Sequence, residues 1–324
     1  MYVGIEIGGT KLQLGLGDGD GVLHALWRDT VVPADGADGI RRQITQAIPE
    51  LLASAKRNRN ELRGVGIGFG GPVDDATCTV IKSHQIAGWD GFPLARWIAD
   101  LIGLPAVLGN DADVAGLAEA LFGAGKGLSP IFYITIGSGI GGGLIINGEI
   151  YRGCGRGAAE FGHLQIKTFW LRDSKTVFDD PPKTLEELAS GWGIAKTAQQ
   201  SVLSEKPIRS LLYPMVQGGR KLTAKDVVNA VRQGDAFAES VLRTAIAFLA
   251  DGVCQVIALL SPRRIVIGGG VALTGEELLF KPLRQFVAKR VFKPFADCYD
   301  IVPAALGEEV VVHGALALAR KRLG

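Results

Sequence analysis

Two segments of the chain, 129 residues apart, repeat one pattern of an apolar strand, a glycine turn and a second strand. Residues 3–16 read VGIEIGGTKLQLGL, and residues 132–146 read FYITIGSGIGGGLII. The shift 8 + 129 = 137 places Gly8 on Gly137, and it carries the Asp-Gly pair at 18–19 onto the Asn-Gly pair at 147–148. Such pairs favour type I′ hairpin turns, so the repeat predicts two similar sheets that face each other.

The glycine turns favour a nucleotide clamp, because glycine backbone brings N–H donors close to a phosphate without an intervening side chain. Thr10 and Lys11 add a hydroxyl and an ammonium group to the first turn, and Lys11 either points at a phosphate or extends into solvent. Gly137, Gly139 and Gly142 match the dinucleotide fingerprint only formally, since a strand follows them instead of a helix. A nicotinamide-dependent dehydrogenase is therefore less favoured than a phosphate-binding protein.

Composition and charge limit the class of protein. The 324 residues, 47% of them hydrophobic, suffice for two domains with buried cores. A net charge of +2 gives no overall field for nucleic acid or for an anionic membrane. The four cysteines share no short spacing, and we find no signal-peptide pattern, so we expect reduced thiols and a cytoplasmic location. The apolar stretch at 245–260 contains Asp251 and predicts a buried helix.

Strand and helix patterns alternate along the chain, which predicts an α/β fold class. We expect further strands at 22–28, 64–69, 106–108, 264–267 and 299–302. We expect helices at 38–56, with a kink at Pro49, and at 92–102, 110–122, 185–203, 224–232, 235–260, 275–291 and 308–322.

Two pairs of polar residues are candidates for chemistry. Asp111 either caps the helix that begins there or accepts a proton from a substrate hydroxyl that Asn110 orients. Glu160 and His163 follow a glycine-rich segment at 153–157, and this placement favours a functional role over a purely structural one.

Taken together, these residues resemble the ROK sugar kinases, within the actin-like ATPase and sugar kinase superfamily. The resemblance rests on residues 6–11, 110–113, 137–143, 160–163, 185–191 and 267–271, in the family's order. It implies a duplicated RNase H-like fold of two domains with a central cleft. The first would be an N-terminal α/β domain, residues 1–112, joined by the C-terminal helix at about 305–324. The second would be a larger C-terminal α/β domain, residues 113–304.

The resemblance also implies ATP and Mg²⁺ as cofactors, a hexose as substrate and a homodimer, with neither nucleic acid nor a membrane as partner. Asp111 would be the general base. The hexose hydroxyls would be bound by Gly71, Asn110, Asp111, Glu160, His163 and Glu186. The nucleotide would be held by Gly8, Gly9, Thr10, Lys11, Gly137, Ser138, Gly139, Gly268, Gly269 and Gly270.

The chain departs from the family pattern at two places. The first phosphate turn usually begins with Asp, whereas here Glu6 would hold Mg²⁺, through a water, with one methylene more. The zinc-binding cysteines of many members fall on Val177, Asp179 and Thr184, so we expect no zinc. Bulky side chains of the same loop would pack in place of the metal: Trp170, Phe178, Pro181 and Pro182.

We therefore expect ATP-dependent phosphorylation of a hexose, first of all glucose at its 6-hydroxyl. Polyphosphate-using glucokinases of the same family also lack the cysteines, so the phosphoryl donor stays open. Glu6 motivates a second alternative, a catalytically silent sugar-binding protein. A sugar-responsive repressor is disfavoured, because the first hairpin starts at residue 3 and leaves no room for a preceding helix-turn-helix.

Overall fold

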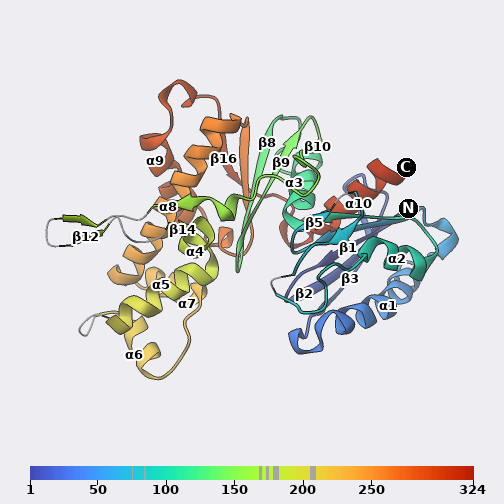
Figure 1. The fold of residues 1–324 in the computed structure, drawn as a ribbon, viewed down its shortest axis with the longest axis horizontal. Coiled ribbons are helices and arrows are strands. Elements are labelled where there is room, and N and C mark those ends of the chain that lie inside the picture. The colour runs from blue at the N-terminus through green and yellow to red at the C-terminus, as the bar shows by residue number, and fades with distance from the viewer. Residues whose placement is uncertain (75, 84, 168–169, 173–174, 178–181, 205–208) are drawn as a thin grey trace. The chain divides into compact units, whose positions relative to one another are not determined.

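The computed structural model describes residues 1–324 except 75, 84, 168–169, 173–174, 178–181 and 205–208 (Figure 1). These residues form two compact units. The first comprises Met1–Tyr133, Gly142–Ala159 and Ala304–Gly324, and the second comprises Ile134–Gly141 and Glu160–Pro303. The expected division placed 113–133 and 142–159 in the second domain. They lie in the first unit, where α3 (Asp111–Leu121) packs against α10 (Val310–Leu323) and also contacts β10 (Glu149–Ile150).

A five-stranded sheet with the order β3-β2-β1-β4-β7 forms the centre of the first unit. β1 pairs antiparallel with β2 and parallel with β4, which in turn pairs parallel with β7. The remaining elements of this part are β1 (Tyr2–Ile7), β2 (Lys11–Gly17), β3 (Leu23–Thr30), α1 (Gly36–Ser54), β4 (Gly64–Phe69), β5 (Val73–Asp74), β6 (Thr79–Val80), α2 (Leu94–Ile102) and β7 (Ala106–Asn110).

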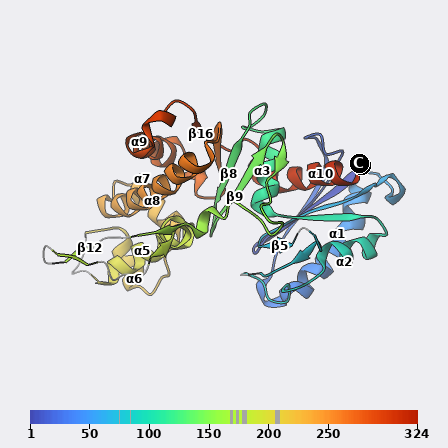
Figure 2. The same cartoon turned by 45° about the horizontal axis from the view of Figure 1, so that its top comes forward.

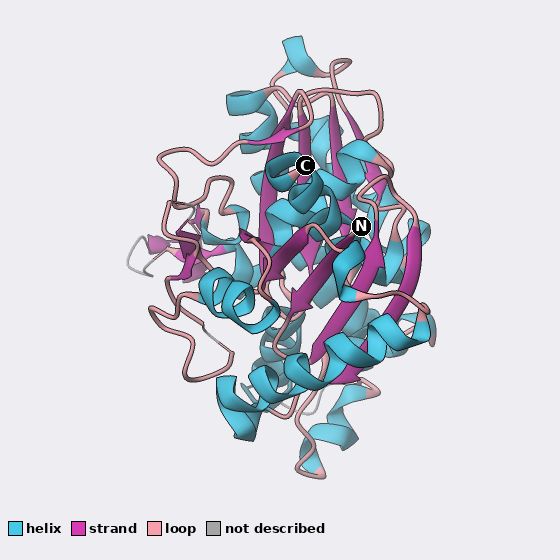
Figure 3. Cartoon of the chain, turned by 90° about the vertical axis from the view of Figure 1, so that its right-hand side faces the viewer, coloured by secondary structure: helices cyan, strands magenta, loops and turns pink. Residues whose placement is uncertain are grey.

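Helices cover this sheet on both faces (Figures 2 and 3). α1 and α2 pack on β2, β3, β4 and β7, and they enclose a core with alternate strand residues such as Val3 and Ile5. The residues between them point the other way, toward α10. Gly4 and Gly66 occupy such positions, and an added Cβ at Gly66 would lie 1.8 Å from the carbonyl oxygen of Ala315. Glycine therefore permits the close approach of α10 to the strands.

A second five-stranded sheet has the order β10-β9-β8-β15-β16. In both sheets three consecutive strands of the chain are followed by two later strands, which confirms the similarity that the repeated hairpin predicts. The elements are β8 (Ile131–Ile136), β9 (Ile140–Ile146), β10 (Glu149–Ile150), β11 (Gln165–Ile166), β12 (Trp170–Arg172), β13 (Lys175–Val177), β14 (Lys183–Thr184), α4 (Leu185–Ala189), α5 (Gly191–Ser204), α6 (Leu212–Gln217), α7 (Ala224–Arg232), α8 (Ala236–Leu260), β15 (Arg264–Gly268), α9 (Lys281–Arg290) and β16 (Asp300–Pro303).

Two of the expected helices are interrupted. The helix expected at 185–203 divides into α4 and α5 at Ser190, whose backbone is extended and whose hydroxyl accepts a hydrogen bond from the N–H of Gly193. The helix expected at 275–291 begins with a π-helical turn, Glu276–Phe280, and continues as α9. α1, by contrast, continues through Pro49.

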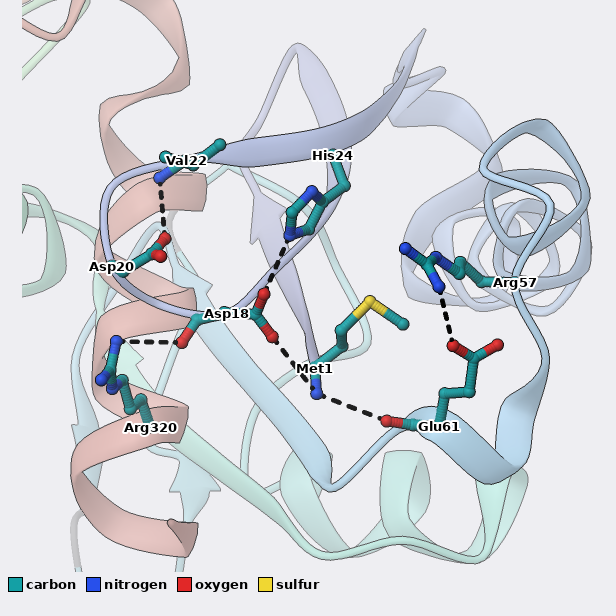
Figure 4. A network of polar contacts seen from close by, with 8 residues as sticks. All are labelled: Met1, Asp18, Asp20, Val22, His24, Arg57, Glu61 and Arg320. Atoms are coloured by element: carbon teal, nitrogen blue, oxygen red, sulfur yellow. Dashed lines mark hydrogen bonds and ion pairs between the residues drawn. The ribbon is translucent and has the colours of Figure 1, made fainter.

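The two hairpin connections differ. Asn147 and Gly148 both have positive φ, as a type I′ turn requires. The first connection is longer, residues 18–22, and Asp18 does not have positive φ, so the type I′ prediction there was wrong. The Asp18 carboxylate bonds instead to His24 at 3.0 Å and lies 3.5 Å from the amino group of Met1 (Figure 4). The hydrogen bond with His24 lowers the pKa of Asp18.

In the described part of the chain, α8 has the length and composition of a membrane span. More than half of its most apolar window, 56%, is buried inside the protein, and α4, α5, α7 and α9 contact it. α8 is thus the core helix that its sequence predicts.

The close approach of α10 to the sheet generates a test of stability. Gly66→Ala places a methyl group against the Ala315 carbonyl, and we expect the free energy of unfolding to fall by about 2–4 kcal/mol. Gly218→Ala is the control, because its Cβ would lie 3.3 Å from the nearest atom. Urea denaturation measures both, and an unchanged Gly66→Ala would contradict the packing.

Candidate functional site

Three turns leave one edge of the first sheet side by side. β1, β4 and β7 are parallel, and their last residues, Ile7, Phe69 and Asn110, are in register. The turn after β1 contains Gly8, and the turn after β4 contains Gly70, whose N–H donates to the Ile7 carbonyl at 2.9 Å. Since ligands of open α/β sheets bind at the carboxyl ends of parallel strands, this edge is the candidate site of the first unit.

At the third turn the structure separates the roles of Asn110 and Asp111. The Asn110 side chain caps α3 by accepting from the N–H groups of Ala112 (2.9 Å) and Asp113 (3.3 Å), and it donates to the Gly71 carbonyl at 3.0 Å. Asp111 is the first helical residue, and its Oδ1 accepts from its neighbour's N–H at 2.8 Å. Asn110 is thus the cap of α3, and Asp111 is the first residue of the helix.

The first glycine turn carries a buried polar network. Glu6, only 6% exposed, lies opposite Gln13 in the strand pair. Lys11 Nζ is 3.0 Å from Glu6 Oε1, and Gln13 Nε2 donates to Glu6 Oε2 at 3.1 Å. Both donors also bond to the backbone carbonyl of Glu308, each at 3.1 Å. The turn is therefore tied to the segment that enters α10.

Burial has a large effect on Glu6. It raises the pKa of this carboxyl group to about 7, and the negative charges of Asp111 and Glu308 add to the rise, while Lys11 opposes it. The charges of Lys11 and Asp111 both act on Glu6, so the glycine turn and the helix start share one electrostatic environment.

The Mg²⁺ predicted at Glu6 needs an oxygen that can face the metal or its waters. Each oxygen of Glu6 already accepts from Lys11 or Gln13, and the described residues contain no group of three or more acidic, His or Cys side chains that could hold a metal. Both oxygens of Glu6 are thus engaged by the hairpin, and the water-mediated contact with Mg²⁺ stays a prediction. The absence of zinc also stays a prediction. Phe178, Asp179 and Pro181, which belong to the loop where many family members bind zinc, lie outside the described residues.

In the second unit, the repeated turn is bound to α4 and α5. Glu186 Oε2 accepts from the N–H of Ile140 at 2.7 Å, and the N–H of Gly191 donates to the carbonyl of Gly137 at 2.9 Å. The N–H of Trp192 donates to the carbonyl of Ser138 at 3.3 Å. Glu186, predicted to bind the hexose, thus lies at the second glycine turn.

The glycine run 268–270 lies beside the same turn. A Cβ at Gly269 would fall 2.6 Å from the carbonyl oxygen of Ile136, and the N–H of Val271 donates to that oxygen at 2.8 Å. Glu160 and His163 are exposed and belong to one short turn, in which the His163 N–H donates to the Glu160 carbonyl at 3.0 Å. The predicted nucleotide-binding segments 137–139 and 268–270 therefore lie together in the second unit.

Sequence reasoning missed two members of the network. Gln13 was available from the hairpin, because a strand period of two puts Lys11 and Gln13 on one face and the turn puts Gln13 opposite Glu6. Nothing in the local sequence indicates that the Glu308 carbonyl, 295 residues from Gln13, joins them.

The raised pKa of Glu6 gives a pH dependence with a definite sign. The folded protein holds this proton more tightly than the unfolded chain does, so the contribution to stability is full below about pH 4.5 and is lost as the pH rises through about 7. Glu6→Gln removes this titration, so the unfolding free energy of the variant minus that of wild type should rise by about 1–3 kcal/mol from pH 5 to pH 8. Urea denaturation across this range checks it. Glu277→Gln, in an exposed pair with Lys281, should show no such gain.

Similar sequences and similar solved structures indicate the same protein family. Glucokinases of Halalkalibacterium halodurans and Thermotoga maritima are each 32% identical to this chain, over 99% of it and over 95% and 98% of their own lengths. The solved structure of a ROK family glucokinase from Streptomyces griseus in complex with glucose and AMPPNP matches with a TM-score of 0.77 at 30% identity and covers 99% of both chains. The fold is thus the duplicated, actin-like α/β fold expected from the sequence. Residues 2–322 match the ROK family, and the chain belongs to that family.

Proposed function

We propose that the protein is a sugar kinase that transfers a phosphoryl group from ATP to a hexose, with glucose as the first candidate. Two glucokinase relatives support the activity, and the Streptomyces griseus complex with glucose and AMPPNP supports the pair of ligands. The observation that supports the proposal is the common edge of β1, β4 and β7, where Ile7 and Asn110 are in register through Phe69. The glycine turn follows Ile7 directly, and Asp111 follows Asn110 directly.

In this proposal Asp111 is the general base. Its carboxylate accepts the proton of the hexose hydroxyl as that oxygen attacks the terminal phosphoryl group, and the bond to the leaving diphosphate breaks in line. Its position in the first turn of α3 places it at a helix N-terminus, where negative charge is stabilised.

Other residues bind and orient the reactants. Hexose hydroxyls are assigned to Gly71, Asn110, Glu160, His163 and Glu186. Asn110 is held on both sides, by α3 and by the Gly71 carbonyl, so its amide is fixed before a substrate arrives. Phosphates are assigned to Gly8, Gly9, Thr10, Lys11, Gly137, Ser138 and Gly139, and the adenosine to Gly268, Gly269 and Gly270. Lys11, whose side chain is 40% exposed, supplies a positive charge that a phosphate can reach.

Replacing the base tests this assignment. Asp111→Asn keeps the size of the side chain but removes the proton acceptor, so we expect kcat to fall about 10²–10⁴-fold with the thermal unfolding midpoint little changed. Asp38→Asn is the matched control, because Asp38 also lies in the first turn of a helix and is exposed. Near-normal turnover of Asp111→Asn would show that another group is the base.

Donor and acceptor are tested together. We expect wild-type protein to form a hexose phosphate from glucose and ATP, measured by ADP release over a panel of hexoses, with polyphosphate as the alternative donor. Turnover with polyphosphate but not with ATP would show that polyphosphate is the phosphoryl donor. Hexose binding by calorimetry without turnover on any pair would favour the silent sugar-binding alternative.

A further inference from the structure

Glu119 is a buried carboxylate that the proposed mechanism does not use. It lies on α3 and is 0% exposed. Oε2 accepts from the N–H of Ala124 at 2.7 Å, and Oε1 accepts from the N–H groups of Ala305 and Leu306 at 2.9 Å each. A buried carboxylate without such partners is strongly unfavourable, so these bonds fix the position of the backbone that supplies the donors.

The backbone segment that Glu119 holds also contacts the hairpin of the first glycine turn. Residues 304–309 begin where the chain returns to the first unit and end at the start of α10. Only two residues beyond Leu306, the Glu308 carbonyl accepts from Lys11 Nζ and Gln13 Nε2. Segment 304–309 is thus held by Glu119 at one end and by the hairpin at the other.

The short distance along the chain makes the two contacts interdependent. A residue spans at most about 3.6 Å of chain, so two residues cannot absorb a large displacement of Leu306 without moving the Glu308 carbonyl. That carbonyl and the Glu6 carboxylate both contact the Lys11 ammonium group. If the Glu308 carbonyl moved away, Lys11 would keep its contact with Glu6 but not with the carbonyl. The position of the Lys11 charge would then change.

We propose that Glu119 is a positioning residue for Lys11, acting through segment 304–309. The inference rests on the proposed function, in which Lys11 contacts the phosphoryl donor. An ammonium group ordered before binding loses less entropy when the donor arrives, so Glu119 strengthens donor binding without touching the donor. Hexose binding does not involve Lys11 and is expected to stay unchanged.

A purely structural role makes a different prediction. Glu119→Gln keeps the size of the side chain but replaces one acceptor oxygen by an NH₂ group that faces backbone N–H donors. If Glu119 only stabilised the fold, the folded variant would bind the donor normally. If it positions Lys11, the KM for ATP rises about tenfold, while the KM for the hexose stays within about twofold.

A double-mutant cycle on the full-length protein separates the two roles. We expect Glu119→Gln to raise the KM for ATP about tenfold when Lys11 is present and less than about twofold in the Lys11→Met background. Glu309→Gln is the control, because it removes a charge from the same segment but pairs with Arg28 outside the Lys11 network. Additive effects of the two substitutions would overturn the inference.

The outcome for this inference can be told apart from the outcome for the proposed function. If wild-type protein phosphorylates a hexose and the effects are additive, only the inference falls. If wild type phosphorylates none, the proposed function falls, and the same cycle is measured on the dissociation constant of AMPPNP by calorimetry. Coupling there supports the inference, and additivity or absence of binding overturns it. Glu119→Asp, which keeps the charge, replaces Glu119→Gln if that variant does not fold.

Discussion

The close approach of α10 to the first sheet is the constraint on which the rest of this unit depends. Glycines at positions 4 and 66 place no strand side chain in the way, so the backbone carbonyls of Val312 and Ala315 come close to the strands. α10 contacts β1, β4 and α3, so its start cannot move independently of the strands that carry the turns. The carbonyl of Glu308, just before α10, is consequently available at a fixed place for Lys11 and Gln13.

Two buried glutamates meet this fixed segment in different ways. Glu119 accepts three backbone N–H groups, which are themselves part of the fold and need no side-chain ordering. Glu6 instead accepts from the ammonium group of Lys11 and the amide of Gln13, and burial raises its pKa to about 7. One carboxylate therefore serves as a rigid anchor, whereas the other changes its charge in the neutral pH range. Glu119 bonds to segment 304–309 directly, whereas Glu6 is joined to it through Lys11 and Gln13. The stability of the segment is thereby linked to the electrostatics of the turn.

The apolar periodicity of the sequence predicted the two similar hairpins and the residues at which their strands end. The glycine turn after Ile7 and the helix start at Asp111 follow from apolar period and capping, and the structure has both where they were expected. The pattern could not choose between Asn110 and Asp111 as the cap, because both residue types favour that position and the choice depends on Gly71, 39 residues away. The break at Ser190 likewise depends on a hydrogen bond that periodicity does not contain.

The glutamate in place of the usual aspartate becomes intelligible from strand register. Gln13 lies directly across from Glu6, and its amide reaches the second carboxylate oxygen while Lys11 reaches the first. A shorter side chain at position 6 would withdraw from at least one of these donors, because both distances are already about 3 Å. The longer carboxylate is thus matched to a hairpin that carries Gln two residues after Lys. The replacement of the usual Asp by Glu6 thus belongs to a set of three side chains, Glu6, Lys11 and Gln13, that fit one another in the folded hairpin. That fit holds the Lys11 charge at the turn whether or not a metal accompanies the phosphoryl donor.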